Sequence, residues 1–237
     1  ETARFGDASA NTAVIAGETT EVEIPLDLSI HGDELVVTAT ADARTLAELA
    51  QPVGVLSGTE LAVAARGSLG ETLSTQPGVN STFFGTGASR PVVRGQGGNR
   101  IRILENGVDS GDVSDTSPDH AVALDPLSAE KIEIVRGAAT LLYGSNAIGG
   151  VVNVLDARIA EYRSSSPIEG LVQLVGGSNA DETTGAAAVG GSLGALTWRA
   201  GGFTRTSDDY ASGDGEVVNS DSESDSANLG LSFVGDS

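Results

Sequence analysis

One acidic segment, residues 109–125 (DSGDVSDTSPDHAVALD), holds most of the side chains that could do chemistry. It contains one of the two histidines of the chain, His120, directly after Asp119. Imidazole nitrogen and carboxylate oxygen are workable ligands for zinc and similar divalent ions. Two adjacent ligands do not complete a four-coordinate site, so the alternative is a solvated acidic loop with an incidental histidine. The carboxylates of the segment are those of Asp109, Asp112, Asp115, Asp119 and Asp125.

Other chemistry finds little support in the sequence. It shows no Ser-His-Asp order in a suitable context, no paired catalytic carboxylates on a framework and no nucleotide motif. The glycine-rich stretch Gly95-Gln96-Gly97-Gly98 lacks the Lys-Ser/Thr that follows in a phosphate loop, and it lies between two expected strands. These glycines therefore predict a tight turn. We expect no enzyme and no bound cofactor.

Composition limits the partners and the membrane topology. The formal charge is 13 − 33 = −20, which excludes nucleic acid and disfavours anionic membrane surfaces. Cations are better partners, although such acidity also serves solubility or a salty habitat. There is no cysteine, hence no disulfide or thiolate metal site. No apolar run approaches the ~20 residues of a membrane helix, whereas a transmembrane β-barrel stays possible because its strands are short and alternate in polarity.

A mixed α/β unit, expected over residues 45–156, carries the acidic segment. Ser57 precedes Glu60 by three residues, and Ser68 precedes Glu71 by three, which is capping-box spacing before short helices. The second helix, predicted over residues 69–75, meets a strong breaker in Gln76-Pro77-Gly78.

Strand signals surround the acidic segment. Residues 91–94 form a short apolar run, and Asn106-Gly107 predicts a tight turn after an alternating stretch that begins near Ile101. Two further strands are predicted around Ile132 and over residues 151–155. Residues 111–119 show no period and are expected to form an exposed loop.

Residues 167–237 alternate in polarity. Val172 and Leu174 share one face, Leu196 and Trp198 alternate with polar residues, and residues 227–233 repeat the pattern. Strands of about ten residues with one apolar face, joined alternately by short and long polar connections, are typical of outer-membrane barrels. A soluble β-sandwich produces a similar local pattern, so this zone alone does not decide between them.

Several motifs occur together in one order: ELVVTAT at Glu34–Thr40, LGETLSTQPGV at Leu69–Val79, PVVRG at Pro91–Gly95 followed by NRIRILENGV at Asn99–Val108, IEIVRG at Ile132–Gly137, and YGSNAIGGVVNV at Tyr143–Val154. In this order they resemble the plug of TonB-dependent outer-membrane receptors, with the first motif similar to a TonB box. The resemblance covers roughly half of the chain.

The resemblance implies a fold and a domain order. We expect a mixed α/β plug domain at residues 45–156, followed at residues 167–237 by about the first four antiparallel strands of a transmembrane β-barrel. Residues 31–44 would be a linker with the TonB box. Residues 1–30 are similar to the end of a carboxypeptidase-regulatory-like β-sandwich. Since the family's barrel has about 22 strands, we expect a fragment cut at both ends.

The resemblance also implies energised uptake across the outer membrane of a Gram-negative bacterium. The plug and the N-terminal segment would face the periplasm, the strands would contact outer-membrane lipid, and the partner would be TonB with its inner-membrane ExbB/ExbD motor. An isolated β-prone segment can add a strand to the sheet of another protein. The residues of the expected TonB box are Glu34, Leu35, Val36, Val37, Thr38, Ala39 and Thr40.

Specific roles follow by matching motifs. Arg94 and Arg136 match the plug arginines that latch the plug to carboxylates of the barrel wall. The stretch from Ser117 to Val154 looks like the plug of zinc-uptake receptors, which assigns a metal site to Asp119 and His120, with Zn²⁺ as the first candidate for the transported ligand.

Other ligands and functions stay open. A siderophore, haem or cobalamin would use aromatic or basic residues, and Phe83 and Phe84 could serve such a ligand or belong to the core. A function of another class is a non-transporting surface binding or signalling protein.

Overall fold

The computed structural model describes residues 35–36, 44–45, 53–137, 140, 143–156, 158–160, 163–164 and 166–235. The chain divides into two compact units, Glu1–Ala50 and Gln51–Ser237. In the first unit, strand β1 (Leu35–Val36) pairs antiparallel with strand β2 (Arg44–Thr45). Two residues of the expected TonB box are therefore extended. The rest of the box and the sandwich-like residues 1–30 lie outside the described residues.

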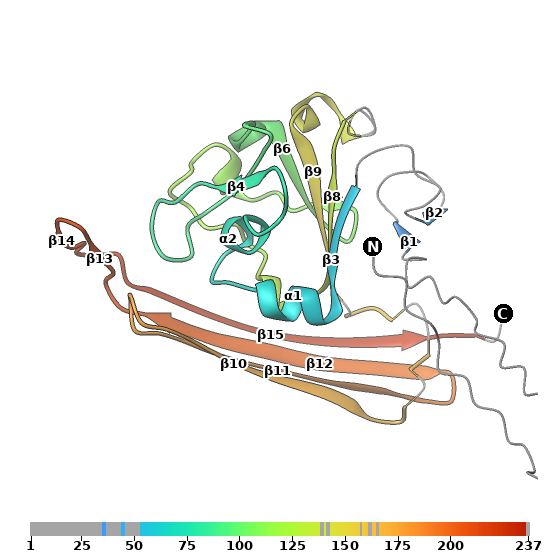
Figure 1. The fold of residues 1–237 in the computed structure, drawn as a ribbon. Helices are drawn as coiled ribbons and strands as arrows, with labels where there is room; N and C mark the ends of the chain where they lie inside the picture. The colour runs from blue at the N-terminus through green and yellow to red at the C-terminus, as the bar shows by residue number, and fades with distance from the viewer. Residues whose placement is uncertain are drawn as a thin grey trace, which may run out of the picture. The chain divides into compact units, whose positions relative to one another are not determined.

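The second unit begins with an α/β region built on a five-stranded sheet of order β3-β8-β9-β6-β7 (Figure 1). Strands β6 and β9 are parallel, and the other neighbours are antiparallel. The strands are β3 (Val53–Ser57), β6 (Ile101–Glu105), β7 (Val108–Asp109), β8 (Ala129–Val135) and β9 (Gly150–Asp156).

Two short helices, a hairpin and several single turns of 3₁₀-helix complete the α/β region. The helices are α1 (Gly58–Ala64) and α2 (Leu69–Leu73), and the hairpin pairs β4 (Val79–Ser81) with β5 (Pro91–Val93). The 3₁₀ turns are η2 (Gly98–Arg100), η3 (Val113–Asp115), η4 (Pro126–Ser128) and η6 (Ser145–Ala147).

The two predicted capping boxes have different outcomes. At α2 the serine cap is confirmed, because the Ser68 hydroxyl accepts from the Glu71 amide at 3.4 Å. The Glu71 carboxylate accepts from the Ser68 hydroxyl at 2.9 Å. At α1 the prediction is wrong, because the Ser57 side chain makes no capping hydrogen bond. Gly58 enters that helix with φ of +53°, a left-handed geometry that carries the Ser57 hydroxyl away from the first-turn amides.

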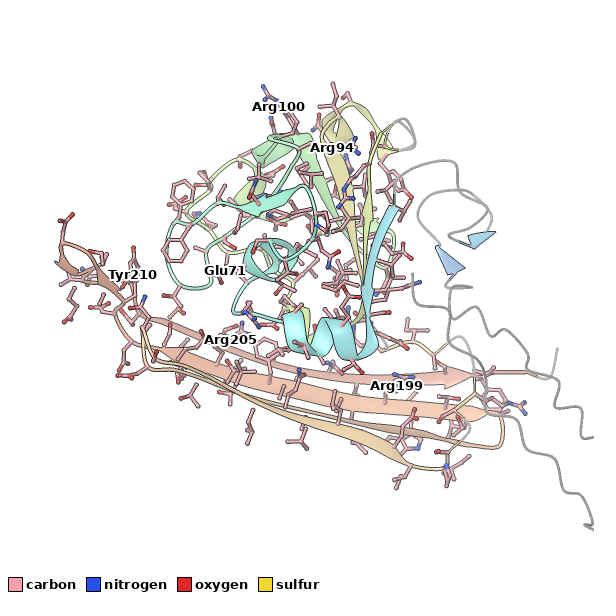
Figure 2. The ribbon with its side chains drawn as sticks, in the orientation of Figure 1. Glu71, Arg94, Arg100, Arg199, Arg205 and Tyr210 are labelled. Carbon is pink, nitrogen blue, oxygen red and sulfur yellow. The ribbon has the colours of Figure 1, made fainter. Side chains whose placement is uncertain are left out.

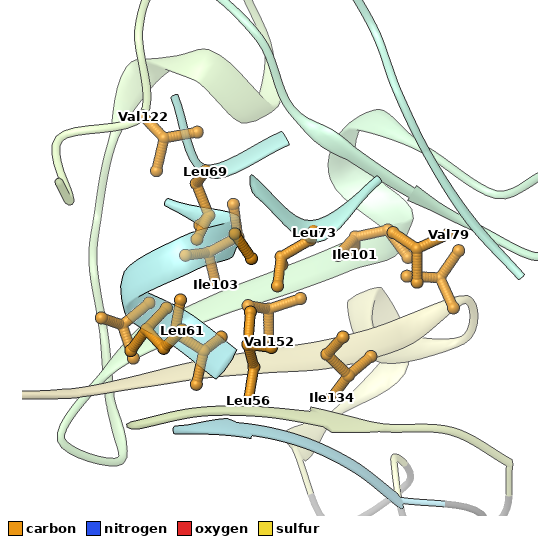
Figure 3. Close-up of a cluster of buried hydrophobic side chains, with 14 residues drawn as sticks. Leu56, Leu61, Leu69, Leu73, Val79, Ile101, Ile103, Val122, Ile134 and Val152 are labelled. Atoms are coloured by element: carbon orange, nitrogen blue, oxygen red, sulfur yellow. The ribbon is translucent and has the colours of Figure 1, made fainter. Parts of the chain in front are cut away.

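A buried apolar cluster lies between the sheet and these shorter elements (Figure 3). Ile132 and Ile134 of β8, each fully buried, contribute one face of that strand, as their alternation in the sequence predicts. Val151 and Val152 are adjacent in β9 and both fully buried, because the sheet is covered on both faces. Val152 packs in the larger cluster and Val151 in a smaller one on the opposite face.

Two tight turns occur where the sequence predicts them. Asn106 and Gly107 have φ of 50° and 80°, which is the two-residue hairpin geometry that joins β6 to β7. Arg94 and Gly95 have φ of 50° and 79° in the same type of turn, closed by reciprocal backbone bonds of 2.9 Å between Val93 and Gln96. The glycine-rich stretch after β5 is therefore a turn, as predicted.

A four-stranded antiparallel sheet of long strands, here called the long-stranded sheet, follows in the order β10-β11-β12-β15 (Figure 1). Its strands are β10 (Glu169–Gly177), β11 (Glu182–Leu193), β12 (Leu196–Ser207) and β15 (Ser222–Phe233). A small hairpin of β13 (Ala211–Ser212) and β14 (Gly215–Glu216) lies in the long connection before β15. Among the described residues, no helix is long and apolar enough to cross a membrane.

The two faces of the long-stranded sheet differ in polarity. Trp198 lies opposite Leu231, and Leu196 opposite Phe233, so these side chains share one face. The large apolar residues of this face are exposed and include Ile168, Val172, Leu174, Val189, Leu193, Leu196, Leu229, Leu231 and Phe233. The other face carries Thr184, Thr197, Arg205 and Ser207, all buried. The predicted alternation is thus present in three dimensions.

Candidate functional site

Most of the acidic segment is committed to ion pairs inside the protein. Asp109 binds Arg102 with Oδ2 2.7 Å from Nε, and Asp112 binds Arg90 with Oδ1 2.9 Å from Nη1. A third carboxylate, that of Asp125, lies 2.6 Å from Nη1 of Arg205 on β12. These three aspartates neutralise arginines and are not arranged around a common point. Among the described residues, no group of three or more His, Cys, Asp or Glu side chains could hold a metal ion.

Residues 111–119 form a mostly exposed loop with one 3₁₀ turn, as expected, but the ion pair of Asp112 within it is buried. The Asp112 and Arg90 side chains are 5% and 3% exposed. Burial alone would raise the pKa of Asp112, but hydrogen bonds from Ser114 and Ser110 and the charge of Arg90 together lower it. The Asp112 carboxylate also caps η3 by accepting from the Ser114 amide at 2.9 Å. Asp112 therefore has a structural role, in which it neutralises Arg90 and caps η3.

Asp119 and His120 lie together at the surface, as the sequence predicted. The Nδ1 atom of His120 is 3.2 Å from Oδ1 of Asp119, and Ser117 donates to the same oxygen at 2.6 Å. The hydrogen bond from Ser117, and after it the one with His120, lowers the pKa of Asp119 and keeps the carboxylate ionised. When Nδ1 donates, Nε2 carries the free lone pair, so Asp119 orients an imidazole that can bind a metal through Nε2.

A groove of about 720 Å³ opens beside this pair. Asp119 lines it from the α/β region, and Arg205 and Ser224 line it from the long-stranded sheet, while His120 does not line it. Aromatic side chains are present at the same place: Phe84 and Tyr210 line the groove, and the Phe83 ring meets the Tyr210 ring edge-on at 5.3 Å between centroids. The groove therefore offers both carboxylate and aromatic surface.

The two arginines expected to form a latch occupy neighbouring places. Arg94 is exposed in the turn after β5 (Figure 2). Arg136 directly follows β8. Nε and Nη2 of Arg136 are buried and make no hydrogen bond within the described part of the chain. Burial, and then the charge of Arg94, lower the pKa of Arg136. Two buried nitrogens of the Arg136 guanidinium thus have no partner among the described residues, a geometry that suits a carboxylate from another element.

Sequence reasoning missed the arginines that bind the acidic segment. Arg90 and Arg205 are 22 and 80 residues from the aspartates that they meet. The sequence alone could have placed Arg205 on the polar face of β12. The alternation that puts Arg199 on that face puts Arg205 there as well. A buried arginine on that face requires an acidic partner.

Comparison with known proteins identifies the architecture. Residues 45–151 match the family described as TonB-dependent Receptor Plug Domain. The vitamin B12 transporter BtuB of Photobacterium profundum is 33% identical over 173 residues, which cover 70% of this chain and 26% of that protein. The hemin receptor of Yersinia pestis is 38% identical over 121 residues, which cover 51% of this chain and 18% of that protein.

A solved structure, that of the copper transporter OprC, superposes with a TM-score of 0.63 at 25% identity, covering 78% of this chain and 28% of that chain. The chain spans between 18% and 28% of the length of the curated relatives that it matches. The mixed α/β region with its family match, followed by long antiparallel strands that are apolar on one face, gives a consistent assignment. Residues 45–151 are therefore a plug domain of the TonB-dependent receptor type, followed by strands of the kind that form the barrel of these receptors.

Proposed function

We propose that the protein to which this chain belongs is a TonB-dependent outer-membrane transporter that takes up a scarce small ligand. The observation that carries the proposal is a plug-family region joined to a long-stranded sheet with one exposed apolar face and one polar face. An apolar face suits outer-membrane lipid, and a polar face suits a plugged lumen. The protein resides in the outer membrane of a Gram-negative bacterium, with the plug facing the periplasm.

TonB, with ExbB and ExbD, is the proposed energy source. The segment Glu34–Thr40 would add a strand to the TonB sheet, because main-chain hydrogen bonds along a strand share a pulling load. The extended conformation of Leu35–Val36 in β1 is compatible with this role. Its pairing with Arg44–Thr45 would then be exchanged for pairing with TonB.

Zinc or another divalent metal ion is the first candidate for the ligand. The support is the exposed Asp119–His120 pair, in which the carboxylate orients the imidazole and leaves Nε2 available. The solved structure with the TM-score of 0.63 is that of a protein named as a copper transporter, which is consistent with a metal cargo. One histidine nitrogen leaves a four-coordinate ion incomplete, so further ligands would come from elements beyond the described residues.

Cobalamin, haem or a siderophore is the second candidate. The exposed rings of Phe83 and Phe84 favour it, since a large ligand with an extended apolar surface stacks on aromatic side chains. The relatives named as a vitamin B12 transporter and a hemin receptor are consistent with a cargo of this kind.

The plug-to-barrel latch is proposed for Arg94 and Arg136. Two buried nitrogens of Arg136 without a partner among the described residues support it, because leaving such groups unpaired is costly and a bidentate carboxylate would satisfy both. The two side chains are close enough for the charge of Arg94 to lower the pKa of Arg136. One or two carboxylates of the barrel wall would therefore stabilise both arginines.

Zinc binding by the full-length receptor tests the metal assignment. We expect the Asp119→Ala/His120→Ala double variant to bind zinc at least about tenfold more weakly in calorimetry, because it removes the ligand and its orienting carboxylate. The double variant Asp214→Ala/Asp208→Ala, which removes two exposed acids of the long loop, is the matched control and should bind as the wild type does. Unchanged affinity in the first variant would remove the metal assignment and leave the aromatic surface of Phe83 and Phe84 as the candidate site.

A further inference from the structure

One arginine of the long-stranded sheet reaches the plug. The Arg205 guanidinium, on β12, donates from Nη1 to the Asp125 carboxylate at 2.6 Å and to the Gly67 carbonyl at 2.7 Å (Figure 2). On the sheet side, its Nε donates to the Thr184 hydroxyl of β11 at 3.1 Å and lies 3.5 Å from the Glu182 carboxylate. A single side chain thus joins two strands of the barrel to two separate segments of the plug.

Both members of the ion pair are removed from water. The side chains of Arg205 and Asp125 are 5% and 11% exposed. Burial raises the pKa of Asp125, and the charge of Arg205 opposes that effect. Removing one partner of such a pair leaves an uncompensated buried charge, so the two groups depend on each other.

The plug segments held by Arg205 are structurally important. Asp125 caps η4 by accepting from the Leu127 amide at 2.7 Å, and it ends the stretch that carries Asp119 and His120. Gly67 directly precedes Ser68, the N-cap of α2. One guanidinium therefore fixes the base of the acidic segment and the start of a core helix at the same time.

We propose that Arg205 forms a second latch between plug and barrel and that it positions the segment of residues 117–125. Its charges are reversed relative to the proposed latch of Arg94 and Arg136. In the Arg205 latch the barrel supplies the cation and the plug supplies the carboxylate. Any movement of the plug that carries Asp125 away from β12 has to break this pair. The latch affects uptake only if the proposed function holds.

Hydrogen exchange of the full-length receptor tests the latch without TonB or ligand, so its failure is separate from a failure of the proposed function. We expect Asp125→Asn to raise exchange of the amides of residues 117–128 at least about tenfold, because the asparagine cannot neutralise Arg205. Arg205→Lys should raise it to a similar extent, since one ammonium does not replace the two separate nitrogens, Nη1 and Nε, that bind the plug and Thr184 of the sheet at the same time. Combining the two changes should add little to either alone.

Asp109→Asn is the matched control, because it makes the same chemical change in an ion pair that stays within the plug. It should leave exchange of residues 117–128 unchanged. The proposal is overturned if Asp125→Asn and Arg205→Lys leave that segment protected, or if only amides of β11 and β12 exchange faster, since Arg205 would then serve the sheet alone. Failure of both variants to assemble, with Asp109→Asn assembling normally, would show that the pair is required to dock the plug and would support the latch.

Discussion

At the residue scale, the acidic segment contains carboxylates that pair with arginines and one that lies beside a histidine. Asp109, Asp112 and Asp125 each neutralise an arginine, whereas Asp119 faces solvent beside His120. Asp119 and His120 are adjacent in the sequence, so their proximity needs no tertiary information, and their role as a metal site stays a prediction. The sequence could not predict the arginine partners, because Arg90 and Arg205 are distant in sequence and only the folded chain brings them near.

The buried Asp112 carboxylate makes stability depend on pH. The pKa of Asp112 is lowered in the folded state, so its contribution is present above the ordinary aspartate pKa and is lost as the pH falls through the folded value. We expect Asp112→Asn to destabilise the plug by about 3 kcal/mol at neutral pH, because it leaves Arg90 buried and unpaired. Thermal unfolding of this chain in detergent, between neutral and acidic pH, measures the effect.

The difference between Asp112→Asn and the wild type should shrink as the pH falls, because the wild-type carboxyl becomes protonated too. Asp214→Asn, in the exposed hairpin between β13 and β14, is the control and should change the midpoint little at any pH. A difference that stays constant down to strongly acidic pH would show that the charge of Asp112 is not the stabilising feature.

At the element scale, short-range patterns predicted the strands and turns well. The alternation of β8 and of residues 227–233 and the turn at Asn106-Gly107 all occur as expected. The residues of β11 were a weaker signal because alanine and glycine fill much of the strand, and its length is set by pairing with β10 and β12. The missing cap at Ser57 arises from the backbone of Gly58, which spacing alone does not reveal.

The segment that leaves the plug crosses the polar face of the long-stranded sheet. The Ala160 amide donates to the Ser232 hydroxyl at 2.9 Å, and the Ser164 amide donates to the Ser192 hydroxyl at 2.8 Å. Gly230 lies opposite Arg199 on this face, and a Cβ at Gly230 would lie 1.6 Å from the Arg158 carbonyl oxygen. Glycine is thus required where backbone passes directly over β15.

Gly230→Ala should displace this crossing segment. The added Cβ meets backbone and not a flexible side chain, so we expect a loss of a few kcal/mol, on the scale of overpacked sites. Thermal unfolding of the chain in detergent, together with protease cleavage near residue 160, reports the change. Gly185→Ala in β11 is the matched control, because its Cβ would meet only ordinary contacts of 3.7 Å or more. Equal stability of the two variants would contradict the close crossing.

At the scale of the whole molecule, the plug identity and the two-faced sheet support an energised transporter together. The plug match alone would not explain nine large apolar residues exposed on one face of the long-stranded sheet, namely Ile168, Val172, Leu174, Val189, Leu193, Leu196, Leu229, Leu231 and Phe233. Sequence order and periodicity were sufficient for this architecture. The ligand could not be predicted as firmly, because the plug offers one histidine–carboxylate pair and one aromatic pair, which suit different cargoes.

Binding of the purified periplasmic domain of TonB to the full-length receptor tests the central claim most directly. Proline lacks the backbone N–H and fixes φ, so Val37→Pro interrupts an added strand. We predict that the wild type and the control Gly32→Pro, which lies before the box, bind TonB alike. Val37→Pro should bind at least about tenfold more weakly while it still binds ligand. Equal TonB affinity of all three receptors, or no binding by the wild type, would contradict TonB-dependent transport through this segment.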